Sequence, residues 1–171
     1  MAKCSYCDKK VNFLTKYVCS GCGKVMCGKC LVEVEYNSCA DDLLHRVDST
    51  YVSPKYSLRK GKHFLCKTCA ESYQRKMSNM IKAIDNNEVV KTVSNNYQGS
   101  RFNGLTKIQE IRTYGYREKS DAEDDLKSMA KYLDCTHVLN VEWERTEDEE
   151  KGPKGGTHIF SRWSATGYAA K

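Results

Sequence analysis

The chain is poor in proline and in long apolar runs. Two of its 171 residues are proline, and no segment reaches the roughly 18 apolar residues that a membrane-spanning helix needs. Its mean hydropathy is −0.67 and 40% of its residues are hydrophobic, which is typical of a polar, soluble protein. The N-terminal MAKCSYCDKK is charged but leads into no apolar segment, so we expect no secretory signal. These absences predict an intracellular, cytoplasmic protein, with peripheral contact to membranes left open.

Catalytic motifs are absent as well. The sequence has no Walker motif, no HExxH, no GxSxG and no convincing pair of carboxylates. Because nothing in it assembles into an active site, we expect that the protein is not an enzyme.

Cysteine, in contrast, is abundant. There are ten cysteines, and eight of them form four CxxC pairs: Cys4/Cys7, Cys19/Cys22, Cys27/Cys30 and Cys66/Cys69. In a reducing compartment, repeated CxxC pairs favour metal ligation over a disulfide framework. A redox CxxC normally occurs once and near a βαβ pattern, which this sequence does not show.

The number of pairs suits two metal ions. Structural zinc takes four ligands in a tetrahedron, and thiolate is a suitable ligand. Four pairs supply enough thiolates for two closed sites without an open position for water, so we expect structural rather than catalytic zinc. Consecutive pairs could share a zinc, or the pairs could interleave, with the first and third on one ion and the second and fourth on the other. The spacing alone leaves both arrangements open.

The cysteine pattern resembles a known zinc finger. The spacing C-x2-C-x11-C-x2-C-x4-C-x2-C-x35-C-x2-C, with its CGKVMCGKC core and a helix after the last pair, is similar to the FYVE finger over residues 1 to about 84. FYVE fingers use the interleaved, cross-brace pairing. The resemblance therefore implies two zinc ions, one on Cys4, Cys7, Cys27 and Cys30, the other on Cys19, Cys22, Cys66 and Cys69. RING fingers are similar, but they usually carry a Cys-x-His step that is absent here.

The lipid-reading residues of that family are largely missing. FYVE domains that bind phosphatidylinositol 3-phosphate carry a basic R(R/K)HHCR stretch, and the corresponding stretch here is TKYVCSG. A phosphate site needs several converging donors, so we expect the scaffold without that lipid specificity. The basic cluster SLRKGKHF (57–64) could contact an anionic membrane or RNA, although a solvated loop is the favoured interpretation. The candidate anion or membrane contacts are Lys16, Arg59, Lys60, Lys62 and His63.

The rest of the chain follows a different pattern. Apolar spacing predicts a helix over about 67–85, which closes a first domain at residue 85. Residues 86–171 then show strands at 88–94 and 107–117, a helix opened by a Ser120/Glu123 capping box, and two strands around a charged turn at 147–156. The apolar face of that helix is Ala122, Leu126, Met129, Ala130 and Leu133. The predicted class is α+β: a two-zinc cross-brace finger followed by a ββαββ-type domain with an antiparallel sheet.

The second domain also resembles a family. MAKYLDCTHVLNVEWER and the closing WSATGYAAK are similar to the YbjQ family of small α+β proteins, over about 88–171. That family forms ring-like homo-oligomers, often pentamers, so the resemblance implies an oligomerisation domain. Asp134 and Cys135 stand here in place of a Gly-Ala pair of the family.

Several residues outside the four CxxC pairs are further candidates for metal binding, nucleophilic chemistry or aromatic packing. Cys39, His45 and His63 could ligate a third metal, but they do not make a full zinc ligand set. Cys135 stands near His137, and its apolar neighbours predict a packing thiol with a raised pKa rather than a nucleophile. The tryptophans are expected to pair across the last hairpin, in the core or at a subunit interface: Trp143 and Trp163.

Charge is unevenly distributed along the chain. Residues 1–82 hold 15 Lys and Arg against 7 Asp and Glu, a net +8, and residues 83–171 hold 13 against 15, a net −2. Eight zinc-bound thiolates and two Zn²⁺ lower the first value to about +4. Nucleic-acid binding through bulk charge is correspondingly less favoured.

The main hypothesis is a non-enzymatic, zinc-binding interaction or scaffold protein with an unidentified protein partner. A homo-oligomeric C-terminal domain would display the finger multivalently. The alternatives are phosphoinositide or anionic-membrane binding through the basic loop, a RING-like ubiquitin-ligase module, and nucleic-acid binding.

Overall fold

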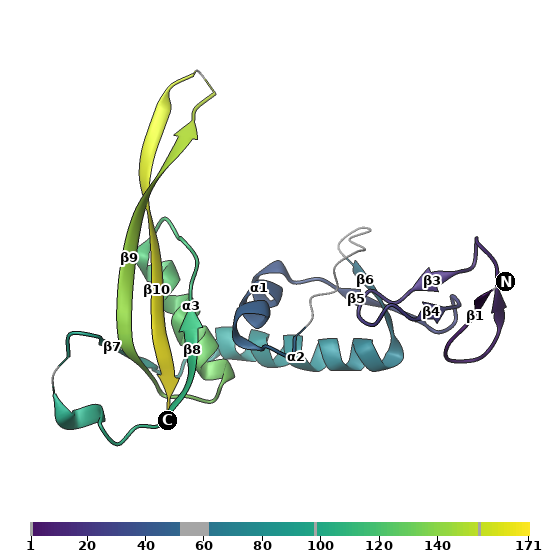
Figure 1. Cartoon of the computed structure of the whole chain (residues 1–171), viewed down its shortest axis with the longest axis horizontal. Coiled ribbons are helices and arrows are strands. Elements are labelled where there is room, and N and C mark those ends of the chain that lie inside the picture. Colours follow the sequence, from purple (N-terminus) through teal and green to yellow (C-terminus); the bar gives the residue numbers. More distant parts are fainter. Residues whose placement is uncertain (1, 52–61, 98, 154) are drawn as a thin grey trace. The chain divides into compact units, whose positions relative to one another are not determined.

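The chain forms two compact units, Met1–Ile81 and Lys82–Lys171 (Figure 1). The computed structural model describes residues 2–51, 62–97, 99–153 and 155–171. Helices and antiparallel sheets are both present, which confirms the predicted α+β class. Within the described residues, none of the helices combines the length and the apolar character needed to cross a bilayer.

In its described residues, the first unit contains three antiparallel strand pairs and two helices. The strands pair as β1–β2, β3–β4 and β5–β6. The elements are β1 (Ala2–Lys3), β2 (Lys10–Val11), β3 (Tyr17–Val18), β4 (Val25–Met26), β5 (Leu31–Glu35), α1 (Ser38–Val47), β6 (Lys62–Cys66) and α2 (Lys67–Asp85). The strands of the first two pairs have two residues each, so their ladders alone cannot stabilise this part of the chain.

Helix α1 lies in the long stretch between the third and fourth cysteine pairs, for which the sequence analysis predicted no helix. The Asn37 side chain caps it by accepting a hydrogen bond of 3.0 Å from the backbone N–H of Ala40. Its apolar residues follow helical spacing and are buried: Ala40, Leu43, Leu44 and Val47. The helix thus adds an apolar core to a unit that is otherwise rich in turns.

Helix α2 has the bounds that its apolar spacing predicts. It follows β6 directly, and its last turn lies beyond Ile81, where the first unit ends. Residues one turn apart form its buried face: Ala70, Tyr73, Met77 and Met80.

The described part of the second unit is a four-stranded sheet with one helix against it. Its elements are β7 (Lys91–Ser94), the 3-10 turn η1 (Ser100–Phe102), β8 (Lys107–Arg112), α3 (Lys119–Tyr132), β9 (His137–Lys151) and β10 (Thr157–Ala170). The strand order is β7-β9-β10-β8, with β10 antiparallel to both of its neighbours. The edge strand β7 lies parallel to β9, so the antiparallel arrangement that we predicted does not extend to this edge.

The core of this unit lies between α3 and the sheet. Of the predicted apolar face, Ala122, Leu126, Met129 and Ala130 are buried, whereas Leu133, at the C-cap, is only half-buried. The sheet buries Ile111, Val138, Val141, Ala165 and Ala169. A Cβ added at Gly167 would lie 2.7 Å from Cγ1 of Val138. The close approach of β10 to β9 at this point therefore requires glycine.

Two local predictions for this unit are wrong. The capping box does not form: α3 begins after Glu118, and the Glu123 carboxylate binds the Lys127 ammonium at 2.8 Å and the Thr92 hydroxyl at 3.2 Å instead. The charged segment expected as a turn continues the hairpin to Lys151, because its acidic residues pair with cations across and beside the strands. The turn itself is therefore shorter than predicted.

The two tryptophans are not directly opposite each other in the hairpin. Trp143 pairs in register with Ala165, and Trp163 pairs with Arg145. The Lys119 ammonium lies 4.4 Å from the ring centroid of Trp143 and 5.5 Å from that of Trp163. A cation from α3 therefore connects the two rings.

Candidate metal centres

The first CxxC pair lies in a tight turn between β1 and β2. The Cys4 N–H donates to the Lys9 carbonyl at 2.9 Å, and the Asp8 N–H donates to the Cys4 carbonyl at 3.0 Å. Asp8 has a positive φ of 55°, which Asp tolerates better than most residues. The turn presents both thiols on the same side, which is the geometry of a zinc knuckle.

The second pair repeats this turn between β3 and β4. The Cys19 N–H donates to the Lys24 carbonyl at 2.9 Å, and the Gly23 N–H donates to the Cys19 carbonyl at 2.8 Å. Gly23 stands where Asp8 stands in the first turn and has a φ of +72°. Two separate segments thus fold into the same knuckle.

The other two pairs lie at the ends of regular elements. The third pair, Cys27 and Cys30, follows β4 in a turn closed by the Cys30 N–H on the Cys27 carbonyl at 3.0 Å. The fourth pair spans the junction of β6 and α2, where the Cys69 N–H donates to the Cys66 sulfur at 3.4 Å. The positive end of the α2 dipole therefore lies at Cys66, where it favours the thiolate form, whereas burial and neighbouring thiols raise the pKa of Cys69.

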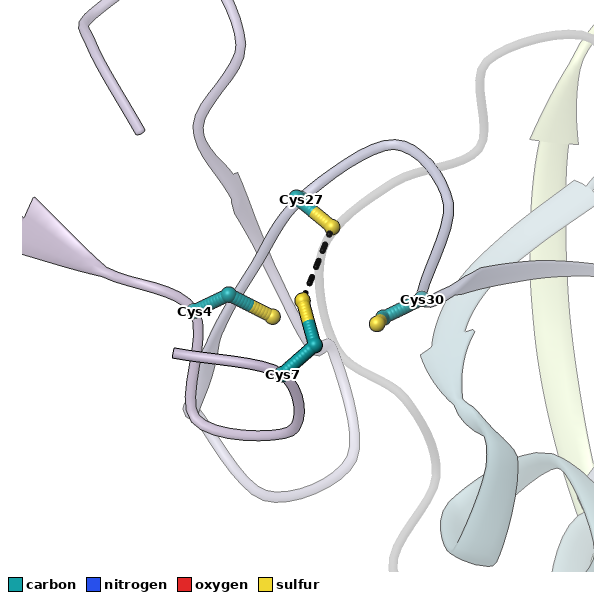
Figure 2. A group of neighbouring side chains, drawn as sticks. All are labelled: Cys4, Cys7, Cys27 and Cys30. Carbon is teal, nitrogen blue, oxygen red and sulfur yellow. Dashed lines mark hydrogen bonds between the residues drawn. The ribbon is translucent and has the colours of Figure 1, made fainter. Parts of the chain in front are cut away.

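The eight cysteines meet in two groups of four. Site one is Cys4, Cys7, Cys27 and Cys30, and site two is Cys19, Cys22, Cys66 and Cys69. Within each group all sulfur atoms lie within 4.8 Å of one another. These are the groups that the interleaved pairing implied. Figure 2 shows the four side chains of site one pointing toward a common centre from two separate segments.

The spacing of the sulfurs suits a tetrahedral ion. The sulfurs of Cys7 and Cys27 are 3.7 Å apart, and those of Cys22 and Cys66 are 4.0 Å apart. A tetrahedron with zinc–sulfur bonds of about 2.3 Å has edges of about 3.8 Å. A disulfide needs about 2.05 Å, and none of the ten cysteines, all of which are described, forms one. The residues present therefore fit one four-coordinate metal ion per group.

The electrostatics of both groups also favour a cation. Burial raises the pKa of Cys4, but backbone N–H groups, including those of Tyr6 and Cys27, outweigh it and bring the pKa to about 6. Burial likewise opposes ionisation of Cys66, and hydrogen bonds, foremost from the Tyr6 hydroxyl, bring its pKa to about 7. Hydrogen bonds with neighbouring thiols raise the pKa of Cys30 to about 12. Four neighbouring thiols cannot all become thiolates without a cation, because their negative charges repel one another. A bound cation offsets this repulsion.

The predicted anion contacts lie in different surroundings. Lys16 is exposed, and the Lys62 ammonium pairs with the Glu33 carboxylate at 3.3 Å. Arg59 and Lys60 fall outside the described residues.

His63 is not at the surface, so the prediction that it contacts an anion is wrong. It is 2% exposed, and its ring lies 5.0 Å from that of Tyr36 and 5.3 Å from that of Tyr73. Burial lowers the pKa of His63. The reason is the alternation of β6, which turns every second side chain, His63 included, into the core.

Two residues that the sequence analysis passed over stand out on the surface of the first unit. Phe13 is 93% exposed and Leu14 is 84% exposed, at the tip of the connection between β2 and β3. The Asn12 carboxamide holds this tip by accepting hydrogen bonds from the N–H groups of Leu14 at 3.1 Å and Thr15 at 3.0 Å. Two adjacent large apolar residues between lysines were the sequence signal for this feature.

The remaining candidate residues do not form a further centre. Cys39 and His45 are exposed on α1, while His63 is buried among aromatic rings. Across the described parts of the chain, only site one and site two bring together enough metal-binding side chains. In the second unit, burial raises the pKa of Cys135 as expected, and its thiol faces the Leu133 carbonyl at 3.5 Å.

Comparison of the chain with protein-family models, curated proteins and solved structures gave no match. The FYVE and YbjQ resemblances therefore stay predictions from the residues alone.

Proposed function

We propose that the protein is a non-enzymatic interaction or scaffold protein whose first unit is held by two structural zinc ions. The observation that carries this proposal is the gathering of eight cysteines into two closed groups of four. Four soft thiolates in a tetrahedron suit zinc, and a complete thiolate set leaves no coordination position for a substrate.

The role of the metal follows from the weakness of the surrounding structure. Strands of two residues and tight turns bury little apolar surface around site one, where the core consists of Cys4, Val11 and Cys27 with a few neighbours. Bound zinc supplies about 10–16 kcal/mol of apparent binding free energy per site, more than a small domain's stability. The cysteines fix the positions of the knuckles, and the knuckles fix the loops that a partner would contact.

The second unit is proposed to assemble copies of the chain. This step rests on the resemblance to the YbjQ family, and the edge strands of the described sheet, β7 and β8, are places where strands of another copy can add. Several fingers on one assembly would raise the affinity for a repeated partner through effective concentration.

Native mass spectrometry of the full chain tests both steps. The proposal predicts two zinc ions per chain and an assembly of defined size. One metal or none would overturn the metal step, whereas two metals on a monomer would leave the finger intact and reject multivalent display.

A second candidate function is docking on an anionic membrane, and the exposed Phe13–Leu14 tip favours it. Lys10 and Lys16 flank the tip and are exposed. Burying each of these apolar side chains in a bilayer contributes about 1.5–3 kcal/mol, and each lysine near an anionic surface adds about 1 kcal/mol. Apolar insertion with basic support is the usual composition of a peripheral membrane contact.

Sedimentation with vesicles, with and without phosphatidylserine, tests the docking. The chain should sediment with anionic vesicles at low salt, and the double substitution Phe13→Ser/Leu14→Ser should abolish this. Ile159→Ser is the matched control, because Ile159 is 66% exposed but lies in the second unit. No sedimentation of the unaltered chain at low salt would remove this candidate.

A further inference from the structure

Tyr6 contacts both candidate metal sites. It lies between the two cysteines of the first knuckle, and its backbone N–H hydrogen-bonds the Cys4 sulfur of site one. Its side chain reaches the other group, where the hydroxyl oxygen lies 3.8 Å from the Cys22 sulfur and also interacts with the Cys66 thiol. A single residue therefore connects ligands of both sites through two different groups.

The direction of the side-chain bond follows from the chemistry of the partners. A metal-bound thiolate has no proton to give, so the phenol O–H must donate and the sulfur must accept. Donors of this kind orient metal ligands, and losing one typically lowers metal affinity about 10- to 100-fold.

The ring of Tyr6 is held in place from the side of site two. The Lys24 ammonium lies 6.0 Å from its centroid, and the Lys24 carbonyl closes the second knuckle. The residue is 39% exposed, so removing the hydroxyl leaves no cavity in the core. The substitution Tyr6→Phe therefore isolates the hydrogen bond to sulfur.

We propose that Tyr6 is a positioning residue that couples the two metal sites. When the first knuckle closes on metal, the main chain of Tyr6 becomes fixed and its hydroxyl is aimed at the sulfurs of site two. Occupation of site one then strengthens binding at site two, and linkage makes the effect reciprocal. This inference rests on the proposed function, because it needs two bound zinc ions.

Zinc competition with a chromophoric chelator, on the full chain, measures the coupling. With both sites intact, Tyr6→Phe should lower the affinity for the zinc ion that binds second by about 10- to 100-fold. With site one disabled by Cys7→Ser and Cys30→Ser, site two should already bind more weakly, and the further effect of Tyr6→Phe should be smaller. An equal effect in both backgrounds would show that Tyr6 supports site two without coupling it to site one.

Cobalt substitution separates the hydrogen bond from a general structural effect. Losing a hydrogen bond to thiolate raises the energy of the sulfur lone pairs, so Tyr6→Phe should move the sulfur-to-cobalt charge-transfer band to lower energy. Tyr17→Phe is the matched control: Tyr17 is also 39% exposed and lies in the same unit, on β3. It should leave both the band and the zinc affinity unchanged.

The outcomes are distinct. If the unaltered chain fails to bind two zinc ions, the proposed function fails. If it binds two, and Tyr6→Phe changes neither affinity nor spectrum, only the role of Tyr6 is overturned. If the chain with site one disabled binds no metal at all, the ratio of the first and second zinc affinities of the chain with both sites intact decides: Tyr6→Phe should lower the cooperativity between the two ions, and unchanged cooperativity would overturn the coupling.

Discussion

The two units of this chain are stabilised by different kinds of interaction. Around site one and in the second knuckle the first unit has strands of two residues, and its buried residues there are mostly cysteines. The second unit has strands of 15 and 14 residues, and a helix buries an apolar face against them. One part depends on bonds to a metal ion, and the other depends on apolar burial and a long strand ladder.

The difference shows where each kind of stabilisation is adequate. A turn-rich segment with little apolar surface cannot offset its loss of chain entropy, so covalent or metal cross-links must do so. A sheet covered by a helix buries enough apolar area to fold without them. The comparison predicts that the two units respond independently to substitutions of different kinds.

The largest expected effect is the loss of one metal ligand. Cys30→Ser should abolish metal binding at site one and unfold the knuckles around it, because a structural zinc site contributes about 10–16 kcal/mol. Circular dichroism and native mass spectrometry check this. Cys39→Ser, on the exposed face of α1, is the control and should keep both metals. Two bound zinc ions in the Cys30→Ser variant would contradict the claim that site one needs all four cysteines to bind zinc.

The next effect is a cavity in the second unit. Leu126 is fully buried on α3, so Leu126→Ala should lower the free energy of unfolding by about 2–5 kcal/mol. Chemical denaturation measures this loss. Asp124→Ala, on the exposed side of the same helix, should cost less than about 0.5 kcal/mol. Zinc content should stay at two ions per chain in both variants, and a loss of zinc would contradict the independence of the units.

A smaller effect is expected at a knuckle glycine. Gly23 has a φ of +72°, so Gly23→Ala should cost about 1–2 kcal/mol and weaken zinc binding at site two. Gly28→Ala is the control, because a Cβ there meets its nearest neighbour, in the Tyr17 ring, at an ordinary 3.6 Å. Chelator competition compares the two variants, and equal zinc affinities would show that the knuckle tolerates the strain.

The smallest effect is a pH-dependent ion pair on α3. Hydrogen bonding and attraction from Lys127 lower the pKa of Glu123 below its ordinary 4.5. A carboxyl group with a lowered pKa stabilises the fold at pH values above its ordinary pKa. This contribution is lost as the pH falls from the ordinary pKa through the lowered one. Glu123→Gln should therefore cost less than about 1 kcal/mol at pH 7 and nothing in strong acid. Urea denaturation at both pH values measures the change in the free energy of unfolding. A loss that persists in acid would assign the effect to packing.

The features that depend on local spacing could be predicted from the sequence. Helix α2 begins right after Cys66 and follows the apolar period of its residues, and α3 buries the face that its spacing marked. The two groups of cysteines lie where the interleaved pairing implied. That pairing came from resemblance, since both arrangements satisfied the spacing.

The remaining features depend on contacts between distant segments. Glu123 forms no capping box because Lys127 and Thr92 offer it partners from its own helix and from β7. His63 is buried because β6 pairs with β5, which no local pattern in a basic cluster discloses. The Tyr6 contact joins residues 16 and 60 positions apart in the chain, so it follows only from the fold of both knuckles.

Hydrogen exchange of the full chain, with and without a strong zinc chelator, tests the central claim most directly. The account predicts that chelation removes amide protection from the cysteine knuckles and the short strands of residues 2–35, while protection in β9, β10 and α3 is unchanged. Protection that persists in the knuckles after complete removal of zinc would contradict it, because the first unit would then hold its fold without metal.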